Sequence, residues 1–85
     1  MKIGETIRIF RIANSLSTKE VAKSIGMSST YVSEVESTHK TPSLECLKKF
    51  ACCFNVPTSI LLKISEQSEE GNWNFQKTLL SQIIL

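Results

Sequence analysis

The chain has 85 residues, a formal net charge of +2 and a hydrophobic share of 41%. A chain of this length forms one domain that buries roughly 60% of its unfolded surface, and its apolar share argues against intrinsic disorder. No apolar run approaches the ~18 residues that a membrane span needs, and the N-terminal residues do not resemble a signal peptide. We therefore expect a cytoplasmic protein.

Positive charge is concentrated in the first part of the chain. Residues 1–65 carry nine Lys or Arg and five Asp or Glu, whereas residues 66–85 carry one Lys and three Glu. A mildly basic body suits a small DNA-binding protein, although many solvated helical surfaces have a similar charge. Charge alone therefore identifies no partner.

The first predicted helix runs from about Gly4 to Ala13, and Asn14-Ser15 interrupts it. Its apolar positions repeat at helical spacing, so one face should be buried. The residues that we expect on that face are Ile3, Ile7, Phe10 and Ile12.

Residues 18–37 fit two short helices joined by a glycine turn. Ser17 and Glu20 have the spacing of a capping box, which predicts the start of the first helix of this pair. Gly26 predicts its end, because glycine adopts the left-handed backbone at low cost. Ser28 is the expected cap of the second helix, and Ala22 is small where the two helices must touch. The apolar residues expected to converge on one interior are Val21, Ile25, Met27, Val32 and Val35.

Two more helices complete the predicted body. Residues 38–42 form a loop that ends at Pro42, because proline disfavours a helical residue before it. Ser43 caps a fourth helix, which ends at residues 55–57. The expected apolar stripe of that helix is Leu44, Leu47, Phe50, Ala51 and Phe54. A fifth helix from Thr58 to about Ile64 then offers Ile60, Leu61 and Ile64 to close the core.

The C-terminal sequence predicts a polar linker over residues 66–72 and an apolar helix over residues 73–85. The residues that we expect to mediate dimerisation are Trp73, Phe75, Leu79, Leu80, Ile83 and Ile84. This helix could cover its own first and fifth helices, or it could pair with a second subunit against an association cost of ~4–15 kcal/mol. We favour a homodimer, because five shorter helices already close the core. The predicted fold class is all-α: a five-helix bundle plus this additional helix.

The helix pair over residues 18–37 favours DNA binding. Two short helices joined by a glycine turn form a helix-turn-helix, whose second helix enters the major groove. The outward positions of that second helix are Ser29, Thr30, Ser33 and Glu34, which are short or polar groups able to hydrogen-bond base edges.

Several motifs in one register resemble the Cro/lambda-repressor-like, or XRE-type, helix-turn-helix family over residues 3–64. They are Ile-Arg-Ile-Phe-Arg (7–11), Leu-Ser-Thr-Lys-Glu-Val-Ala (16–22), Ile-Gly-Met-Ser (25–28), Tyr-Val-Ser-Glu-Val-Glu (31–36), Pro-Ser-Leu (42–44) and Leu-x-x-Phe-Ala-x-x-Phe-x-Val (47–56). The resemblance implies a five-helix DNA-binding bundle that regulates transcription. The layout is also similar to the small controller proteins of restriction-modification systems.

The resemblance further assigns roles to individual positions. It implies base reading by Ser29, Thr30, Ser33 and Glu34, and phosphate contacts by Thr18, Ser28, Tyr31, Ser37, His39 and Lys40. For Tyr31, packing between helices is the alternative. An ion pair between Arg11 and Glu36 would fix the recognition helix on the bundle. Ser15 and Thr38 stand where the family usually has glycine, so we expect the loop after the recognition helix to be shaped differently.

Other chemistry has little support in the sequence. Cys46, Cys52 and Cys53 lack a metal-ligand spacing and read as reduced thiols. No nucleophile–base pair or glycine-rich phosphate loop suggests an enzyme, a cofactor or a small-molecule ligand. The leading hypothesis is a transcriptional repressor or autoregulator that binds a palindromic double-stranded operator as a homodimer. The alternative is an antitoxin-like interaction module that binds another protein through residues 73–85.

Overall fold

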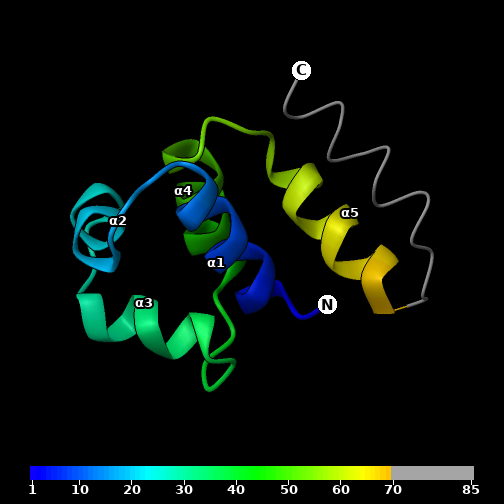
Figure 1. The fold of residues 1–85 in the computed structure, drawn as a ribbon, viewed down its shortest axis with the longest axis horizontal. Helices are drawn as coiled ribbons and strands as arrows, with labels where there is room; N and C mark the ends of the chain where they lie inside the picture. The colour runs from blue at the N-terminus through cyan, green and yellow to red at the C-terminus, as the bar shows by residue number, and fades with distance from the viewer. Residues whose placement is uncertain (70–85) are drawn as a thin grey trace.

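The computed structural model describes residues 1–69, which form five α-helices and no strand. The helices are α1 (Ile3–Ala13), α2 (Thr18–Ile25), α3 (Ser29–Glu36), α4 (Leu44–Cys53) and α5 (Thr58–Glu69) (Figure 1). The predicted all-α class with a five-helix bundle is confirmed. The additional helix predicted over residues 73–85 lies outside the described residues.

Helix α5 is longer than the sequence predicts. It continues to Glu69, five residues beyond the expected end at Ile64, so residues 66–69 are helical rather than the start of a linker. This stretch has no apolar residue to extend the periodic pattern. Its Glu and Gln are nevertheless good helix formers, and it contains neither Gly nor Pro to stop the helix.

Serine side chains cap the N-termini of three helices, as the sequence predicts. The Oγ atoms of Ser17, Ser28 and Ser43 accept hydrogen bonds from backbone amides three residues later, at 3.0, 3.1 and 3.2 Å. At α2 the carboxylate of Glu20 also accepts from the Ser17 amide at 2.9 Å, which completes the capping box. This backbone hydrogen bond lowers the pKa of Glu20.

Four helices end with a residue in the left-handed conformation, namely Ser15, Gly26, Thr38 and Asn55. After α3 the amide of Thr38 donates to Val35 O at 3.1 Å and that of His39 to Glu34 O at 2.9 Å, which is the paired bonding of a Schellman motif. The expectation of a differently shaped loop is therefore wrong: Thr38 has a φ of 67°, the conformation that a glycine would adopt. The hydrogen bonds to the last turn of α3 hold it there.

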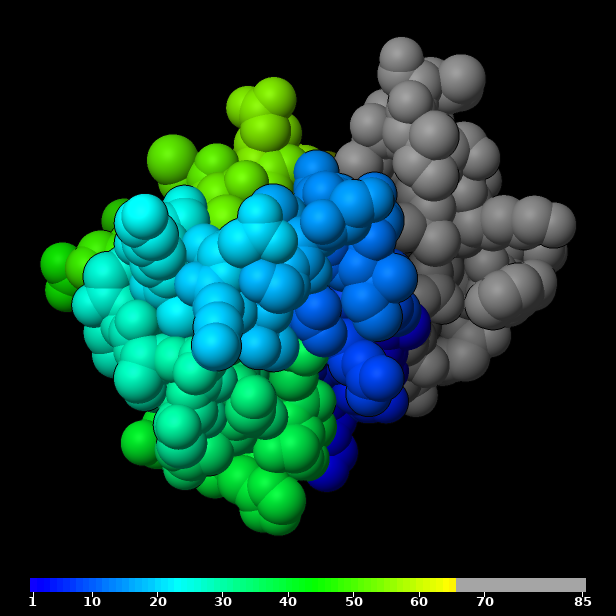
Figure 2. Space-filling view, turned by 60° about the vertical axis from the view of Figure 1, so that its left-hand side comes forward, coloured from blue at the N-terminus to red at the C-terminus, as the bar shows by residue number. Residues whose placement is uncertain are grey.

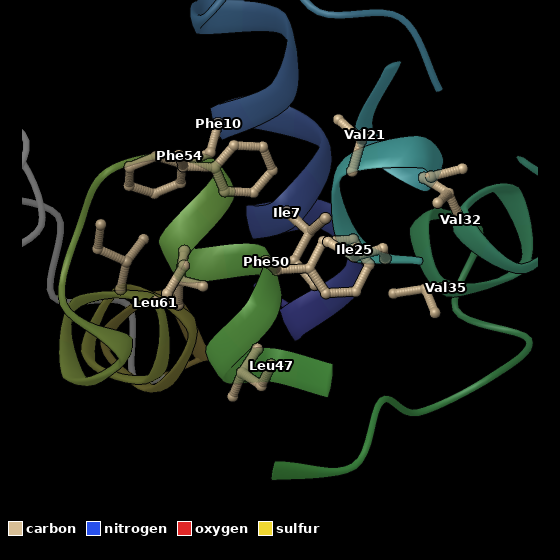
Figure 3. Close-up of a cluster of buried hydrophobic side chains, with 13 residues drawn as sticks. Ile7, Phe10, Val21, Ile25, Val32, Val35, Leu47, Phe50, Phe54 and Leu61 are labelled. Carbon is tan, nitrogen blue, oxygen red and sulfur yellow. The ribbon is translucent and has the colours of Figure 1, made fainter. Parts of the chain in front are cut away.

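All five helices contribute to one apolar core (Figure 3). Phe54 stacks on Phe10 and Phe50, with ring centroids 5.9 and 6.3 Å apart. The buried apolar residues are Ile7, Phe10, Val21, Ala22, Ile25, Val32, Val35, Leu47, Phe50, Ala51, Phe54, Leu61 and Ile64. Ile3 and Ile60 are partly buried against this core, as expected.

Three residues predicted to face the core are exposed instead. Ile12 lies two positions after Phe10, about 200° around the helix, and so points away from the bundle. Met27 lies in the turn before the α3 cap, where no helical face directs it inward. Leu44 shares a face with Leu47 but is the first residue of α4, at the edge of the core, and is 60% exposed.

Candidate nucleic-acid interface

Helix α3 presents a polar outer face. Val32 and Val35 are fully buried on its inner side. Of the residues predicted to read bases, Thr30 and Ser33 are exposed, and Ser29 and Glu34 are partly exposed. Helices α2 and α3 and the loop after α3 lie together on one face of the molecule (Figure 2). The described part of the chain therefore leaves this side of α3 accessible.

An ion pair attaches the C-terminal end of α3 to α1. Arg11 Nε donates to Glu36 Oε2 at 2.6 Å, and Arg11 Nη2 donates to Glu36 Oε1 at 3.0 Å. The guanidinium also donates to the carbonyl of Leu16 at 2.9 Å. The two charged side chains are only 15% and 9% exposed, and the bidentate pair raises the pKa of Arg11. This is the contact expected between Arg11 and Glu36, and it joins the end of α3 to α1.

A second contact between α1 and α3 depends on a glycine. Gly4 is buried, and a Cβ at this position would overlap the backbone carbonyl of Val35. The sequence pattern did not indicate Gly4 as a contact residue. A signal for it exists: Gly4 lies three residues before Ile7 and so falls on the buried side of α1. The glycine allows the two helix backbones to approach closely.

The residues predicted to contact phosphate surround α3. Thr18 is partly exposed in the first turn of α2, and Ser28 is exposed at the N-cap of α3. Amide groups of helix N-termini attract anions. Ser37, His39 and Lys40 are exposed in the following loop. Ser37 Oγ already donates to Glu34 O at 3.2 Å and lies 2.9 Å from His39 Nδ1, so these two side chains order each other.

Tyr31 connects this loop to the core. Its ring packs against the buried cluster, and Lys40 Nζ lies 5.6 Å from the ring centroid in a cation–π contact. Burial, followed by hydrogen bonding to Cys46, raises the pKa of Tyr31 to about 12. The structure thus shows the packing role for Tyr31. The neutral hydroxyl keeps its one proton, which it donates to Cys46.

Cys46 adjoins Tyr31, a neighbour that the sequence pattern did not indicate. Its thiol is partly buried, and its pKa is lowered by hydrogen bonds from Ser43 and Tyr31 and by the charge of Lys49. Among residues 1–69, no group of three or more His, Cys, Asp or Glu residues could hold a metal ion. None of the helices described is both long and apolar enough to cross a membrane.

Comparison with known proteins agrees with this geometry. A family described as helix-turn-helix matches residues 7–61, which span α2, α3 and most of the core. The chain belongs to the helix-turn-helix family. It is a DNA-binding transcriptional regulator of the XRE type.

Two known proteins are similar to this chain, one in sequence and one in structure. The ImmF control region 10 kDa protein of Bacillus phage phi105 is 34% identical over 74 residues, which are 86% of this chain and 82% of the phage protein. The crystal structure of the clp gene regulator ClgR from Corynebacterium glutamicum shares the fold, with a TM-score of 0.74 and 23% identity. That alignment covers 95% of this chain and 85% of the ClgR chain.

Proposed function

We propose that this helix-turn-helix protein is a repressor or an autoregulator, and that it inserts α3 into the major groove of a palindromic operator as a homodimer. The observation that carries the proposal is the accessible polar side of α3, held in place by the Arg11–Glu36 pair. The name of the phage relative, a control region protein, supports a role in controlling gene expression.

The residues of α3 suit direct readout with modest discrimination. Ser33 and Thr30 supply hydroxyl groups, and the Thr30 methyl group can contact a thymine methyl. Glu34 has only acceptor atoms, so the base group that it suits is the cytosine amino group. Because these side chains are short or anionic, DNA shape should contribute to specificity.

Phosphate binding would fix the orientation of α3 on the duplex. The N-termini of α2 and α3 provide amide groups near Thr18 and Ser28. Lys40, whose Nζ atom lies over the Tyr31 ring, provides a positive charge. Such contacts position the protein without reading sequence. A dimer that neutralises ~6–8 phosphates should show a log–log salt slope of about −5 to −7.

The homodimer is proposed from the apolar residues 73–85. A two-fold dimer reads two half-sites about 34 Å apart, one helical turn of DNA. Each subunit then contributes one α3. The regulator would act by occupancy, covering promoter elements that the polymerase needs.

Selection of bound duplexes from a random pool tests the proposal, because it returns the site, its symmetry and its spacing together. On the selected site, Ser33→Glu should weaken binding at least ~100-fold, because it places a second carboxylate against the bases and phosphates. Cys52→Glu is the control: it adds the same charge at an exposed position on α4, away from α3. Equal affinity for the wild type and Ser33→Glu would exclude α3 as the reading helix.

A further inference from the structure

We propose that three exposed apolar side chains on α1 and α5, which we call the outer strip (Ile9, Ile12 and Leu62), are the docking surface for residues 73–85 of a second copy of this chain. The inference rests on the proposed homodimer and adds the surface that receives the C-terminal segment. It predicts an exchange in which each chain covers the other's outer strip.

The outer strip contains most of the large apolar side chains that are exposed in the described part of the chain. Five large apolar side chains are exposed there, and three of them belong to the strip: Ile9 is 43% exposed, Ile12 55% and Leu62 43%. The other two, Met27 and Leu44, lie on other elements. Single exposed apolar residues are ordinary, but a group of them on adjoining helices marks an interaction surface.

Contacts at the N-terminus place the strip residues on the same side of α1 and α5. Ser65 Oγ donates to Met1 O at 3.2 Å, and Thr6 Oγ contacts Met1 Sδ at 3.3 Å, so Thr6 and Ser65 mark where the two helices meet. Figure 1 shows the N-terminus beside the late part of α5, so the two helices run in opposite directions.

The strip follows from these contacts and helical spacing. Ile9 lies three residues after Thr6 and Leu62 three before Ser65, and residues three apart on a helix are neighbours. Both are exposed, so each flanks the α1–α5 contact on the side away from the core. Ile12 continues the strip from Ile9 by the same spacing.

The C-terminal segment is a suitable occupant by length and chemistry. Sixteen residues follow Glu69, and residues 73–85 carry seven large apolar side chains, which are the six named above for the predicted helix and Leu85. A helix of these 13 residues would be about 20 Å long, and α1, with 11 residues, is about 16 Å long. Its apolar face can therefore cover the whole strip.

A second copy is the occupant that fits the DNA-binding geometry. Helix α3 and helix α5 lie at opposite ends of the molecule (Figure 1), so a chain docked at the outer strip leaves the polar outer face of α3 free. A two-fold exchange also forms two identical contacts in one association event. The association cost is then set against twice the apolar burial of a single contact.

The experiment uses the full chain and its one tryptophan, Trp73, as a reporter of burial. Sedimentation of the wild type should give twice the chain mass of 9.5 kDa, and dilution should halve the mass and shift the Trp73 emission to the red together. Ile9→Glu/Ile12→Glu should raise the dimer dissociation constant at least ~100-fold. Leu44→Glu, the control on another exposed apolar residue, should leave mass and emission unchanged.

Mixing two full-length variants separates exchange from other arrangements. Ile9→Glu/Ile12→Glu has an intact segment and Leu80→Glu/Ile84→Glu an intact strip, so each alone should be monomeric. Their mixture should form a 1:1 dimer that is held by one of the two contacts and is weaker than the wild-type dimer. If the strip variant still dimerises, the docking surface is wrong although the proposed homodimer stands. A wild type that is monomeric at every concentration, with blue-shifted Trp73 emission, would show docking within one chain and overturn both.

Discussion

Gly4 of α1 lies directly against the backbone carbonyl of Val35 in α3, with no room for a Cβ atom between them. Two turns along α1, Arg11 binds Glu36 at the last residue of α3. The recognition helix is therefore attached to α1 by a close backbone contact and by a partly buried ion pair. Both contacts can be changed by substitutions that leave the polar outer face of α3 unaltered.

Gly4→Ala should destabilise the protein by about 3 kcal/mol, because the methyl group overlaps a backbone atom that cannot move alone. Alanine is the better helix former by ~1 kcal/mol, so any loss must come from the overlap. Urea unfolding measures it, and DNA affinity should fall as α3 shifts. Gly26→Ala is the comparison, since a Cβ there meets nothing and only its φ of 73° is unfavourable. A Gly4→Ala variant as stable as the wild type would contradict the close approach.

Glu36→Ala should cost about 3 kcal/mol, because it leaves the Arg11 guanidinium, 15% exposed, without its carboxylate partner. Chemical denaturation of the variant gives the value. Glu45→Ala serves as control on an exposed carboxylate of α4 and should lose less than ~1 kcal/mol. A loss below about half a kcal/mol at Glu36 would mean that solvent screens the pair.

Thr38→Gly should stabilise the protein by about 1 kcal/mol. A β-branched residue at a φ of 67° carries a steric cost of ~1–2 kcal/mol that glycine avoids, partly offset by the greater freedom of glycine in the unfolded chain. The shift in thermal midpoint reports it. Thr41→Gly, in the same loop but without a positive φ, should be neutral or destabilising. Equal effects of the two substitutions would refute the argument from backbone conformation.

The pKa of Tyr31 can be measured directly, because the chain has one tyrosine. Tyrosinate absorbance should titrate near pH 12 in the folded protein and near ~10 in urea. Because the folded pKa is the higher one, the contribution of the neutral phenol to stability is complete below about pH 10 and is lost as pH rises through 12. Tyr31→Phe should flatten this alkaline part of the stability curve. A folded midpoint near 10 would show that the hydroxyl is solvated.

The sequence predicts the helices well where the signals are local. Ser17, Ser28 and Ser43 cap helices because their hydroxyls reach amides only three residues away, and Gly26 ends α2 because its own backbone tolerates a positive φ. Apolar spacing in each helix indicates which side is buried. It does not show where a helix leaves the core, so the prediction that Leu44 is buried is wrong. It also does not apply to a turn residue such as Met27.

Local pattern alone determined the all-α class, the order of five helices, their serine caps and the outward residues of the helix at 28–37. The resemblance supplied the Arg11–Glu36 pair, whose members are 25 residues apart. Only the tertiary structure decided how near α1 approaches α3 at Gly4, that Thr38 adopts a glycine-like backbone, and that Tyr31 contacts both Cys46 and Lys40. The physical reason is range: caps and periodicity act within a turn or two of one helix. Burial, charge pairing and backbone strain depend on residues that the chain brings together only after it folds.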